Sequence, residues 1–174
     1  MKIVTRMCTS LDGCVTTADG LPIQLAFPAW DAGALGFYEL QERCDAVLMG
    51  RSTFEPALGA PVWPWGDLAV YVLSSHRPAV SPDHVVFDAD PVRLLERVRR
   101  DSLGGDVHLV GGPKTVDAVL ALGALDELRL LALPILGGEG LRLTPALRSN
   151  ISLTFVDARS WPHGVIELTY RVDN

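Results

Sequence analysis

Three segments of the sequence combine glycine, hydroxyl and basic residues directly after a predicted β-strand. The strands are predicted from apolar runs over residues 46–49, 68–73 and 107–110. The residues that follow them are Gly50, Arg51, Ser52 and Thr53, then Ser74, Ser75, His76 and Arg77, and then Gly111, Gly112, Pro113, Lys114 and Thr115. Glycine lets an anion approach backbone amides closely, and a guanidinium donates two hydrogen bonds to one phosphate. Each segment is therefore a candidate phosphate-binding turn.

The three turns also have a simpler interpretation. Ser52 or Thr53 is suited to N-cap a helical turn, and glycine is common where a strand turns into a helix. Capping does not account for Arg51. Because ligands of open α/β sheets gather at the carboxyl ends of the strands, three anion-suited ends on neighbouring strands favour one long polyanion. A dinucleotide with an additional phosphate on its ribose fits this description, so the sequence predicts NADPH as the cofactor.

Other common chemistries lack their minimum residues in this sequence. Pro113 separates Gly112 from Lys114, so the G-K-[ST] ending of a triphosphate-binding loop is absent, as are G-x-G-x-x-G and G-x-S-x-G. The four histidines and three cysteines have no metal-ligand spacing, so no metal site is expected. With 15 Lys and Arg against 21 Asp and Glu, the net charge of −6 argues against a nucleic-acid partner.

The 174 residues, 48% of them hydrophobic, are enough for a single domain over residues 1–174 with a substantial core. Short apolar runs alternate with helical patterns, which favours an α/β fold with a mostly parallel sheet. Helices are predicted after Asp90, a suitable N-cap, and after Gly112, and a third is predicted between Asp31 and Cys44. The other predicted strands cover residues 2–8, 85–87 and 128–133, and period-two alternation over residues 151–155 and 166–172 predicts an antiparallel hairpin around residues 157–164.

Two further segments concern the surface of the domain. Residues 56–66, with three prolines, Trp63 and Trp65, are predicted to form a loop that is either a hydrophobic lid on the core or a wall of a binding cleft. The arginines within residues 93–100 are expected to form a solvated helix face. No apolar stretch approaches the length of a membrane helix and no secretory leader is recognised, so a cytoplasmic protein without a membrane partner is expected.

The order and spacing of several motifs resemble the dihydrofolate-reductase-like superfamily, most closely the C-terminal reductase domain of the bifunctional riboflavin-biosynthesis deaminase-reductase. The matching segments are Ser10-Leu11-Asp12-Gly13, residues 45–55, Leu73-Ser74-Ser75, Leu109-Val110-Gly111-Gly112, Leu125-Asp126-Glu127-Leu128 and Pro134-Ile135-Leu136-Gly137-Gly138. The resemblance implies a mixed, mostly parallel eight-stranded sheet with flanking helices that binds NADPH along its strand ends. It places phosphates at residues 50–53, the 2′-phosphate region at residues 74–77 and the pyrophosphate at residues 111–115. Relatives are often dimers, so a homodimer is expected, paired or packed through the C-terminal antiparallel strands.

The resemblance also indicates residues on the substrate side. Asp12 lies where this family approaches the reacting ring, so it is the candidate catalytic and substrate-binding residue, contacting the edge of a heterocycle or handling a proton. Alternatively, Asp12-Gly13 is simply a favourable turn. Trp30 is a candidate for stacking on a flat ring or for ordinary packing, and Glu139 is a candidate for the same cleft.

The sequence departs from both parent activities. Residues 33–36 contain no acid in register, where dihydrofolate reductases carry one, and no basic residue follows Trp30 to reach a ribose phosphate. The resemblance therefore implies an NADPH-dependent reductase of a small pyrimidine- or pterin-like heterocycle, similar to the 5-amino-6-(5-phosphoribosylamino)uracil reductase of the riboflavin pathway, acting by direct hydride transfer. Dihydrofolate reductase proper and a non-catalytic NADPH-binding regulatory module are the alternatives.

Overall fold

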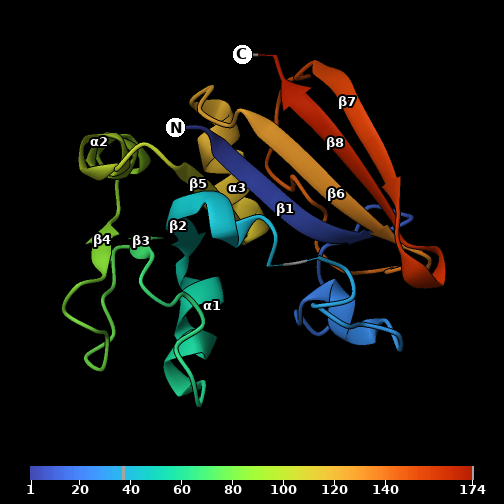
Figure 1. Ribbon diagram of the computed structural model, residues 1–174, viewed down its shortest axis with the longest axis horizontal. Helices are drawn as coiled ribbons and strands as arrows, with labels where there is room; N and C mark the ends of the chain where they lie inside the picture. Colours follow the sequence, from blue (N-terminus) through green and yellow to red (C-terminus); the bar gives the residue numbers. More distant parts are fainter. Residues whose placement is uncertain (37, 174) are drawn as a thin grey trace.

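The computed structural model of the chain describes residues 1–36 and 38–173. Its centre is an eight-stranded sheet in the order β4-β3-β2-β5-β1-β6-β8-β7 (Figure 1). The strands are β1 Ile3–Ser10, β2 Cys44–Gly50, β3 Ala69–Leu73, β4 Val86–Asp88, β5 Asp106–Gly111, β6 Glu127–Leu133, β7 Leu153–Ser160 and β8 Ile166–Val172. The first six strands run parallel, whereas β8 is antiparallel to both β6 and β7. The predicted fold class, the mostly parallel sheet and the C-terminal antiparallel hairpin are confirmed.

The central strands are buried on both faces, which explains their nearly continuous apolar sequences. In β2, Val47, Leu48 and Met49 are each no more than 1% exposed. Leu48 belongs to the core on one face of the sheet, and Val47 and Met49 belong to the core on the other. A sheet that is covered on both faces leaves its edges, where the strands end, as the place for a ligand.

Two helices cover one face of the sheet, and shorter helical turns lie on the other side (Figure 1). α2 Pro91–Asp101 begins at Asp90, whose Oδ1 accepts hydrogen bonds from the amides of Val92 and Arg93. α3 Pro113–Ala121 begins after Gly112, so both predicted helix starts are confirmed. The short helices are α1 Arg51–Phe54, η1 Ile23–Ala26, η2 Gln41–Arg43, η3 Glu55–Gly59 and η4 Pro162–Gly164. Within the described residues, none of the helices has the length and apolarity to cross a membrane.

The helix predicted between Asp31 and Cys44 is wrong. The described residues of this stretch form successive turns, and only η2 near its end is helical. Gly36 has a φ of +58°, which an α-helix does not contain. A Cβ on Gly36 would also collide with the ring of Trp161, so a contact with a distant residue fixes the backbone here.

The loop that follows α1 serves as a cover for the core. The ring of Trp63 meets that of Phe54 edge-on at a centroid distance of 6.2 Å, and Trp65 is only 9% exposed. Both tryptophans pack in the cluster between β2, β3 and this loop. The contacts therefore support the lid interpretation of residues 56–66, although the segment begins within η3 rather than as an irregular loop.

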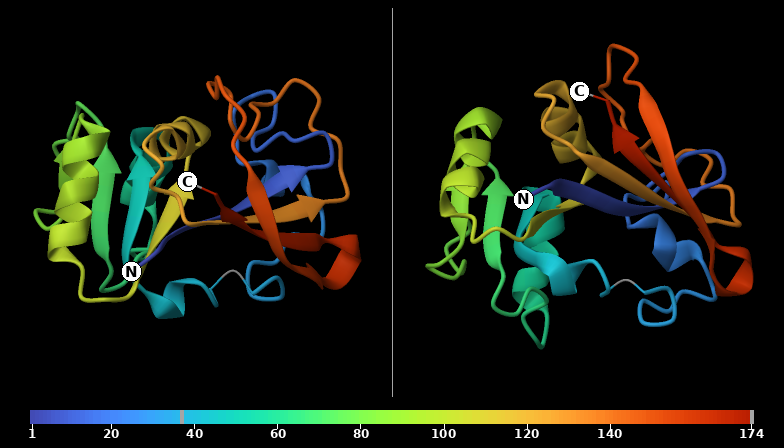
Figure 2. Two further views of the ribbon diagram at one scale, coloured as in Figure 1. Left: turned by 90° about the horizontal axis from the view of Figure 1, so that it is seen from above. Right: turned by 45° about the horizontal axis from the view of Figure 1, so that its top comes forward.

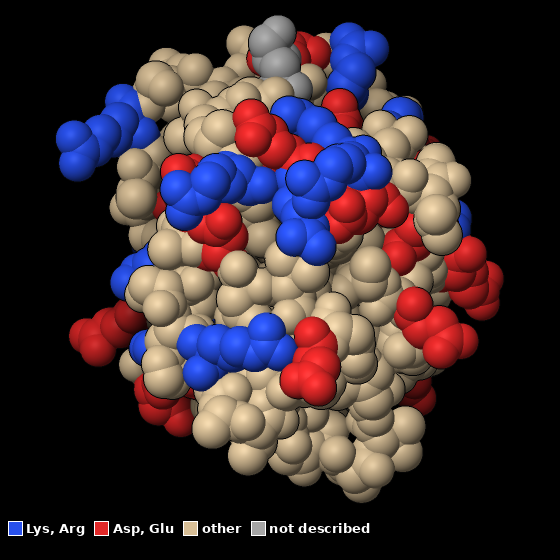
Figure 3. All heavy atoms as spheres, turned by 90° about the vertical axis from the view of Figure 1, so that its left-hand side faces the viewer, with Lys and Arg blue, Asp and Glu red and all other residues tan. Residues whose placement is uncertain are grey.

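The basic face of α2 is neutralised locally. Arg93 pairs with Asp88 and Asp90, and Arg97 and Arg100 pair with Asp101. Figure 3, which views the side of the molecule where α2 lies, shows basic (blue) and acidic (red) side chains next to one another. Exposed pairs of this kind contribute little to stability, so the arginines behave as the solvated face that the sequence predicts.

Candidate functional site

The three candidate phosphate-binding turns lie side by side at one edge of the sheet. β3, β2 and β5 are parallel neighbours, so their carboxyl ends meet at the same edge. In the strand register Gly50 lies opposite Leu73, and Met49 lies opposite Gly111. The turns after these strands, together with those after β1 and β6, form what we call the carboxyl rim.

The first turn is built without a side-chain cap. α1 takes Gly50 as its N-cap, and no side chain bonds to the exposed amides, so the interpretation of Ser52 or Thr53 as N-cap is wrong. Both residues instead lie in the first helical turn, close to Gly112 of the neighbouring turn. A Cβ on Gly112 would lie 3.6 Å from Thr53 Oγ1 and 3.8 Å from Ser52 Oγ. Two turns that are 60 residues apart in sequence therefore share one small space, lined by hydroxyls.

The third turn also depends on glycine at two positions. Gly111 has a φ of +127°, which favours glycine, and its peptide bond to Gly112 is cis. Gly112 is the N-cap of α3 and uses no side-chain cap, while Pro113 occupies the first helical position and Thr115 is buried. A Cβ on Gly50 would approach Thr115 Oγ1 to 2.5 Å, so the glycines allow the two turns to come together. The positive end of α3 is consequently directed at the rim.

In the second turn, residues 74–77, the side chains of Ser74 and Arg77 bond within their own loop, whereas those of Ser75 and His76 do not take part in these bonds. Ser74 Oγ donates to the carbonyl of His76 and accepts from its amide, so this side chain holds the turn itself. Arg77 donates to the carbonyls of Val85 and Pro82. Its guanidinium lies 5.2 Å from the centre of the Phe87 ring. Ser75 and His76 are exposed at the rim.

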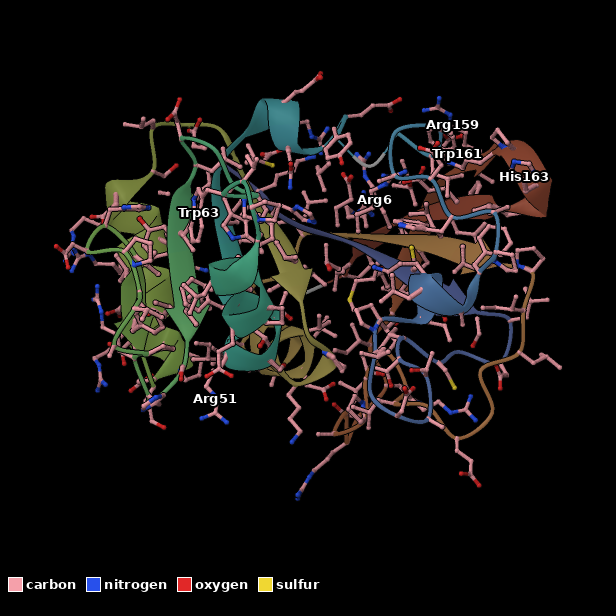
Figure 4. The ribbon with its side chains drawn as sticks, turned by 90° about the horizontal axis from the view of Figure 1, so that it is seen from below. Arg6, Arg51, Trp63, Arg159, Trp161 and His163 are labelled. Atoms are coloured by element: carbon pink, nitrogen blue, oxygen red, sulfur yellow. The ribbon has the colours of Figure 1, made fainter. Side chains whose placement is uncertain are left out.

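Basic side chains at the first and third turns are accessible. Arg51 is 55% exposed, and its Nε lies 3.7 Å from the carboxylate of Glu55 one helical turn later. Figure 4 shows Arg51 on the outside of α1, pointing into solvent. Lys114 is also exposed, at the first turn of α3. Both cations are therefore accessible to solvent near the two turns.

Asp12 fastens two turns of the rim to each other. Its Oδ1 accepts from the amide of Gly137 at 2.7 Å and from Ser10 Oγ at 2.5 Å, and its Oδ2 accepts from the amide of Gly138 at 2.9 Å. The amide of Gly137, the Ser10 hydroxyl and the amide of Gly138 hold the pKa of Asp12 well below its usual range. The carboxylate is therefore ionised at neutral pH. Glu139, which follows Gly138 in the turn after β6, is exposed.

Trp30 lies on the chain that crosses the sheet after β1. It is half-buried and packs against the cluster that contains Phe27, Leu35 and Leu133. This cluster lies on the face of the sheet opposite α3, next to the turns of Asp12 and Gly137. Trp30 thus packs against this cluster and is also partly exposed, which is compatible with both interpretations that the sequence offered.

Two arginines, one beside the rim and one within the sheet, were not singled out from the sequence. Arg142 is exposed, and its Nη1 would lie 3.5 Å from a Cβ on Gly13, so a cation adjoins the Asp12 turn. Arg6 lies in the middle of β1, is 3% exposed and forms an ion pair with Glu167 of β8. The signal for this pair was a charge inside the apolar run of β1 and another inside the alternating run of β8. Arg6 and Glu167 meet because of the order of the strands in the sheet, and the spacing of residues in the sequence does not reveal that order.

A separate cavity of about 490 Å³ lies away from the rim. Tyr71, Asp101 and Leu103 contribute to its walls, together with residues at the beginnings of β2 and β3. It therefore opens at the amino ends of the strands, on the opposite edge of the sheet. Among the described residues no cluster of histidine, cysteine and carboxylate side chains has the arrangement of a metal site.

Comparison with known proteins agrees with this architecture. The family model of the RibD C-terminal domain matches residues 1–166. The uncharacterized protein YwjB of Bacillus subtilis (strain 168) is 26% identical over 165 residues, which cover 94% of each chain. A Shewanella sp. PV-4 structure, described as a candidate riboflavin biosynthesis protein, is 26% identical with a TM-score of 0.83 and full coverage of both chains.

A larger bifunctional enzyme contains the same fold as one of its parts. The Thermotoga maritima diaminohydroxyphosphoribosylaminopyrimidine deaminase/5-amino-6-(5-phosphoribosylamino)uracil reductase has a TM-score of 0.74 at 18% identity, and the match covers 99% of this chain and 56% of that one. At this level of identity the similarity shows a shared fold. Because the family model matches residues 1–166, nearly the whole length, the chain belongs to the RibD C-terminal domain family, a family of reductases.

Proposed function

We propose that this protein is an NADPH-dependent reductase of a small pyrimidine-like heterocycle and that it acts by direct hydride transfer. The observation that carries the proposal is the meeting of the turns at Gly50 and Gly112, where hydroxyls and a helix start surround a space that any side chain would fill. Membership of a reductase family supports the activity. The similarity to the Thermotoga reductase supports the pyrimidine class of substrate.

The residues of the carboxyl rim fit a dinucleotide in a definite order. In our proposal residues 50–53 and residues 111–115 bind the pyrophosphate and adjoining phosphates through amides, hydroxyls and the cations Arg51 and Lys114. Ser75 and His76 contact the 2′-phosphate region, while Ser74 and Arg77 shape that turn from behind. The bound cofactor would supply the hydride, and the protein would supply alignment and local electrostatics.

On the substrate side we assign Asp12 a positioning role. An ionised carboxylate accepts hydrogen bonds and has no proton to donate, so at neutral pH Asp12 orders the turn of Gly137 and is suited to face an amino group of the substrate. Trp30 and Glu139 border the same region in our proposal. Folate reduction is not favoured, because Asp31, which precedes the glycine-rich stretch, accepts a hydrogen bond from the amide of Ala34 and so serves its own turn.

Titration with nicotinamide cofactors tests the cofactor directly. We expect NADPH to quench tryptophan fluorescence and to bind more tightly than NADH, since the rim offers cations and hydroxyls to an additional phosphate. Gly112→Ala is expected to weaken NADPH binding by about tenfold or more, because its methyl group would occupy the anion space without displacing the protein. Gly59→Ala is the matched control, since a Cβ there meets no atom within 4 Å.

Either of two results would contradict the proposal: no binding of NADPH to the wild-type protein at millimolar concentration, or equal affinity in the two glycine variants. Turnover is then measured as NADPH oxidation with 5-amino-6-ribosylaminouracil, its 5′-phosphate and dihydrofolate. Tight binding without oxidation of any of the three would favour a regulatory module instead.

We also propose that the protein is a homodimer. The face of β7 and β8 that carries Phe155, Leu168 and Tyr170 is apolar, and Phe155 is 58% exposed there. Figure 2 shows no helix over these two strands. A second copy of the same face would cover it in a two-fold arrangement.

Phe155→Glu is expected to convert the dimer to a monomer in analytical ultracentrifugation, because it puts a charge into the proposed contact. Val62→Glu, at a position 77% exposed on the lid loop, is the matched control and should leave the mass unchanged. A monomeric wild-type protein at micromolar concentration would refute the assignment.

A further inference from the structure

Arg6 makes an unusual set of contacts from the middle of β1. Its Nε and Nη2 bond to the Glu167 carboxylate at 2.7 and 3.1 Å. On its other side Nη1 donates to the carbonyl of Gly36 and Nη2 to the carbonyl of Leu35, both at 2.8 Å. One buried guanidinium thus joins two strands of the sheet to the chain that passes over them. We call residues 27–36 of that chain the crossing segment.

The Glu167 carboxylate is itself held in place. Trp161 Nε1 donates to its Oε2 at 2.8 Å, and the guanidinium of Arg159 lies 3.6 Å from the centre of the Trp161 ring. Burial alone would raise the pKa of Glu167, but the hydrogen bonds and charge of Arg6, with the Trp161 N–H, bring it below the ordinary value. Figure 4 shows Arg6, Trp161 and Arg159 gathered on the same side of the sheet. The guanidinium therefore has one orientation available to it.

Packing holds the Gly36 end of the crossing segment on one side only, where the ring of Trp161 lies. Phe27 and Leu35 are buried in an apolar cluster, but beside Gly36 lies a small polar cavity of about 100 Å³ whose walls include Arg129 and Asp157. The segment contains no α-helix that would make it rigid. The hydrogen bonds that Arg6 donates to the carbonyls of Leu35 and Gly36 are therefore the contacts that orient this end of the segment.

Stability is a weak explanation for such an arrangement. Burying an ion pair costs desolvation, and apolar residues of similar volume are often as stabilising. The ion pair does fix the position of the guanidinium. Two of its four hydrogen bonds go to Glu167, and the other two then define where Leu35 and Gly36 lie. Trp30 is coupled to that position through Asp31, which accepts from the amides of Ala34 and Leu35.

We propose that Arg6 is a positioning residue for the substrate: its guanidinium, set by Glu167 and Trp161, holds the crossing segment so that Trp30 faces the bound heterocycle. The inference rests on the proposed function, in which Trp30 borders the substrate. Arg6 touches neither cofactor nor substrate in this proposal. Its removal should therefore affect substrate binding and leave the cofactor turns, which belong to β2, β3 and β5, unchanged.

Arg6→Lys tests the proposal, because lysine keeps the charge but cannot bond to a carboxylate and two carbonyls in one plane. We expect amide hydrogen exchange in residues 31–36 to quicken by about tenfold or more, binding of 5,6-diaminouracil to weaken by about tenfold, and the NADPH dissociation constant to stay within twofold. Arg171→Lys is the matched control: Arg171 lies on β8 like Glu167, but its side chain is 66% exposed and pairs with Asp173, so the variant should change none of the three quantities.

Trp161→Phe provides a milder second variant if Arg6→Lys does not fold. It removes the N–H that bonds to Glu167 and keeps an aromatic ring, so a change in the same direction of about threefold is expected. The positioning role is overturned if diaminouracil binds the variants as it binds the wild type, if exchange in residues 31–36 is unchanged, or if the wild type does not bind diaminouracil. A wild type that binds diaminouracil but not NADPH contradicts the proposed cofactor and leaves the role of Arg6 to be decided by exchange and diaminouracil affinity.

Discussion

Replacing Glu167 with leucine is expected to lower the free energy of unfolding by about 3–5 kcal/mol, because it leaves the Arg6 guanidinium buried without its carboxylate. Both side chains are less than a tenth exposed, so water does not take over the lost bonds. The Trp161 N–H loses its acceptor at the same time. Urea unfolding followed by tryptophan fluorescence measures the effect.

Two further variants separate the charge effect from a packing effect. The double variant Arg6→Met with Glu167→Leu removes both charges and is expected to be more stable than Glu167→Leu alone. Glu39→Gln breaks the exposed pair with Arg159, in which the side chains are 60% and 51% exposed, and should cost no more than about 1 kcal/mol. Equal unfolding free energies for the single and double variants would show that the buried charge is not the cause.

Acidification from pH 7 to pH 4 is expected to cost about 3 kcal/mol of stability through His108 alone. His108 is 1% exposed in β5; burial, and then the nearby charge of Arg6, lower its pKa from 6.5 to about 4. Between these two pH values the unfolded chain binds a proton at this site that the folded protein does not. The free energy of unfolding therefore falls as the pH falls through this window, and the loss is complete below about pH 4.

The measurement compares urea unfolding of the wild type and of His108→Leu at several pH values between 7 and 4. The variant should lose about 3 kcal/mol less than the wild type over this range, because leucine has no proton to take up. His84→Gln, at an exposed position, is the control and should follow the wild type. Parallel pH curves for wild type and His108→Leu would show that the buried imidazole does not titrate as described.

Local patterns in the sequence account for most of the fold. The apolar runs of β2 and β5 and the N-cap at Asp90 act over a few residues, so composition and spacing are enough to place them. The alternation over residues 166–172 likewise places β8 correctly, although the burial of its residues does not follow the alternation, because Glu167 is buried and Ile166 is exposed. The carboxyl rim can also be predicted from these local patterns, because neighbouring parallel strands have their carboxyl ends at the same edge of the sheet.

The features that sequence reasoning missed depend on contacts between distant residues. Gly36 adopts a positive φ against the ring of Trp161, and residues 32–36 and 38–40 form turns despite a partly helical composition. Arg77 bonds to carbonyls within its own loop and Ser74 to its own turn, although their residue types are equally suited to phosphate. Asp12 meets Gly137 and Gly138, which no local pattern around Asp12 indicates.

The central place of β1 in the sheet has a consequence for biosynthesis. Its two neighbours, β5 and β6, begin only at Asp106 and Glu127, so the ribosome completes most of the chain before β1 has a partner on either side. Until then β1 is an unpaired segment that carries the apolar residues Ile3, Val4, Met7 and Cys8, and unpaired strands with exposed apolar side chains are prone to aggregate. Arg6 places a charge within that sequence, and a charge of this kind reduces the tendency of an unpaired apolar strand to associate with others.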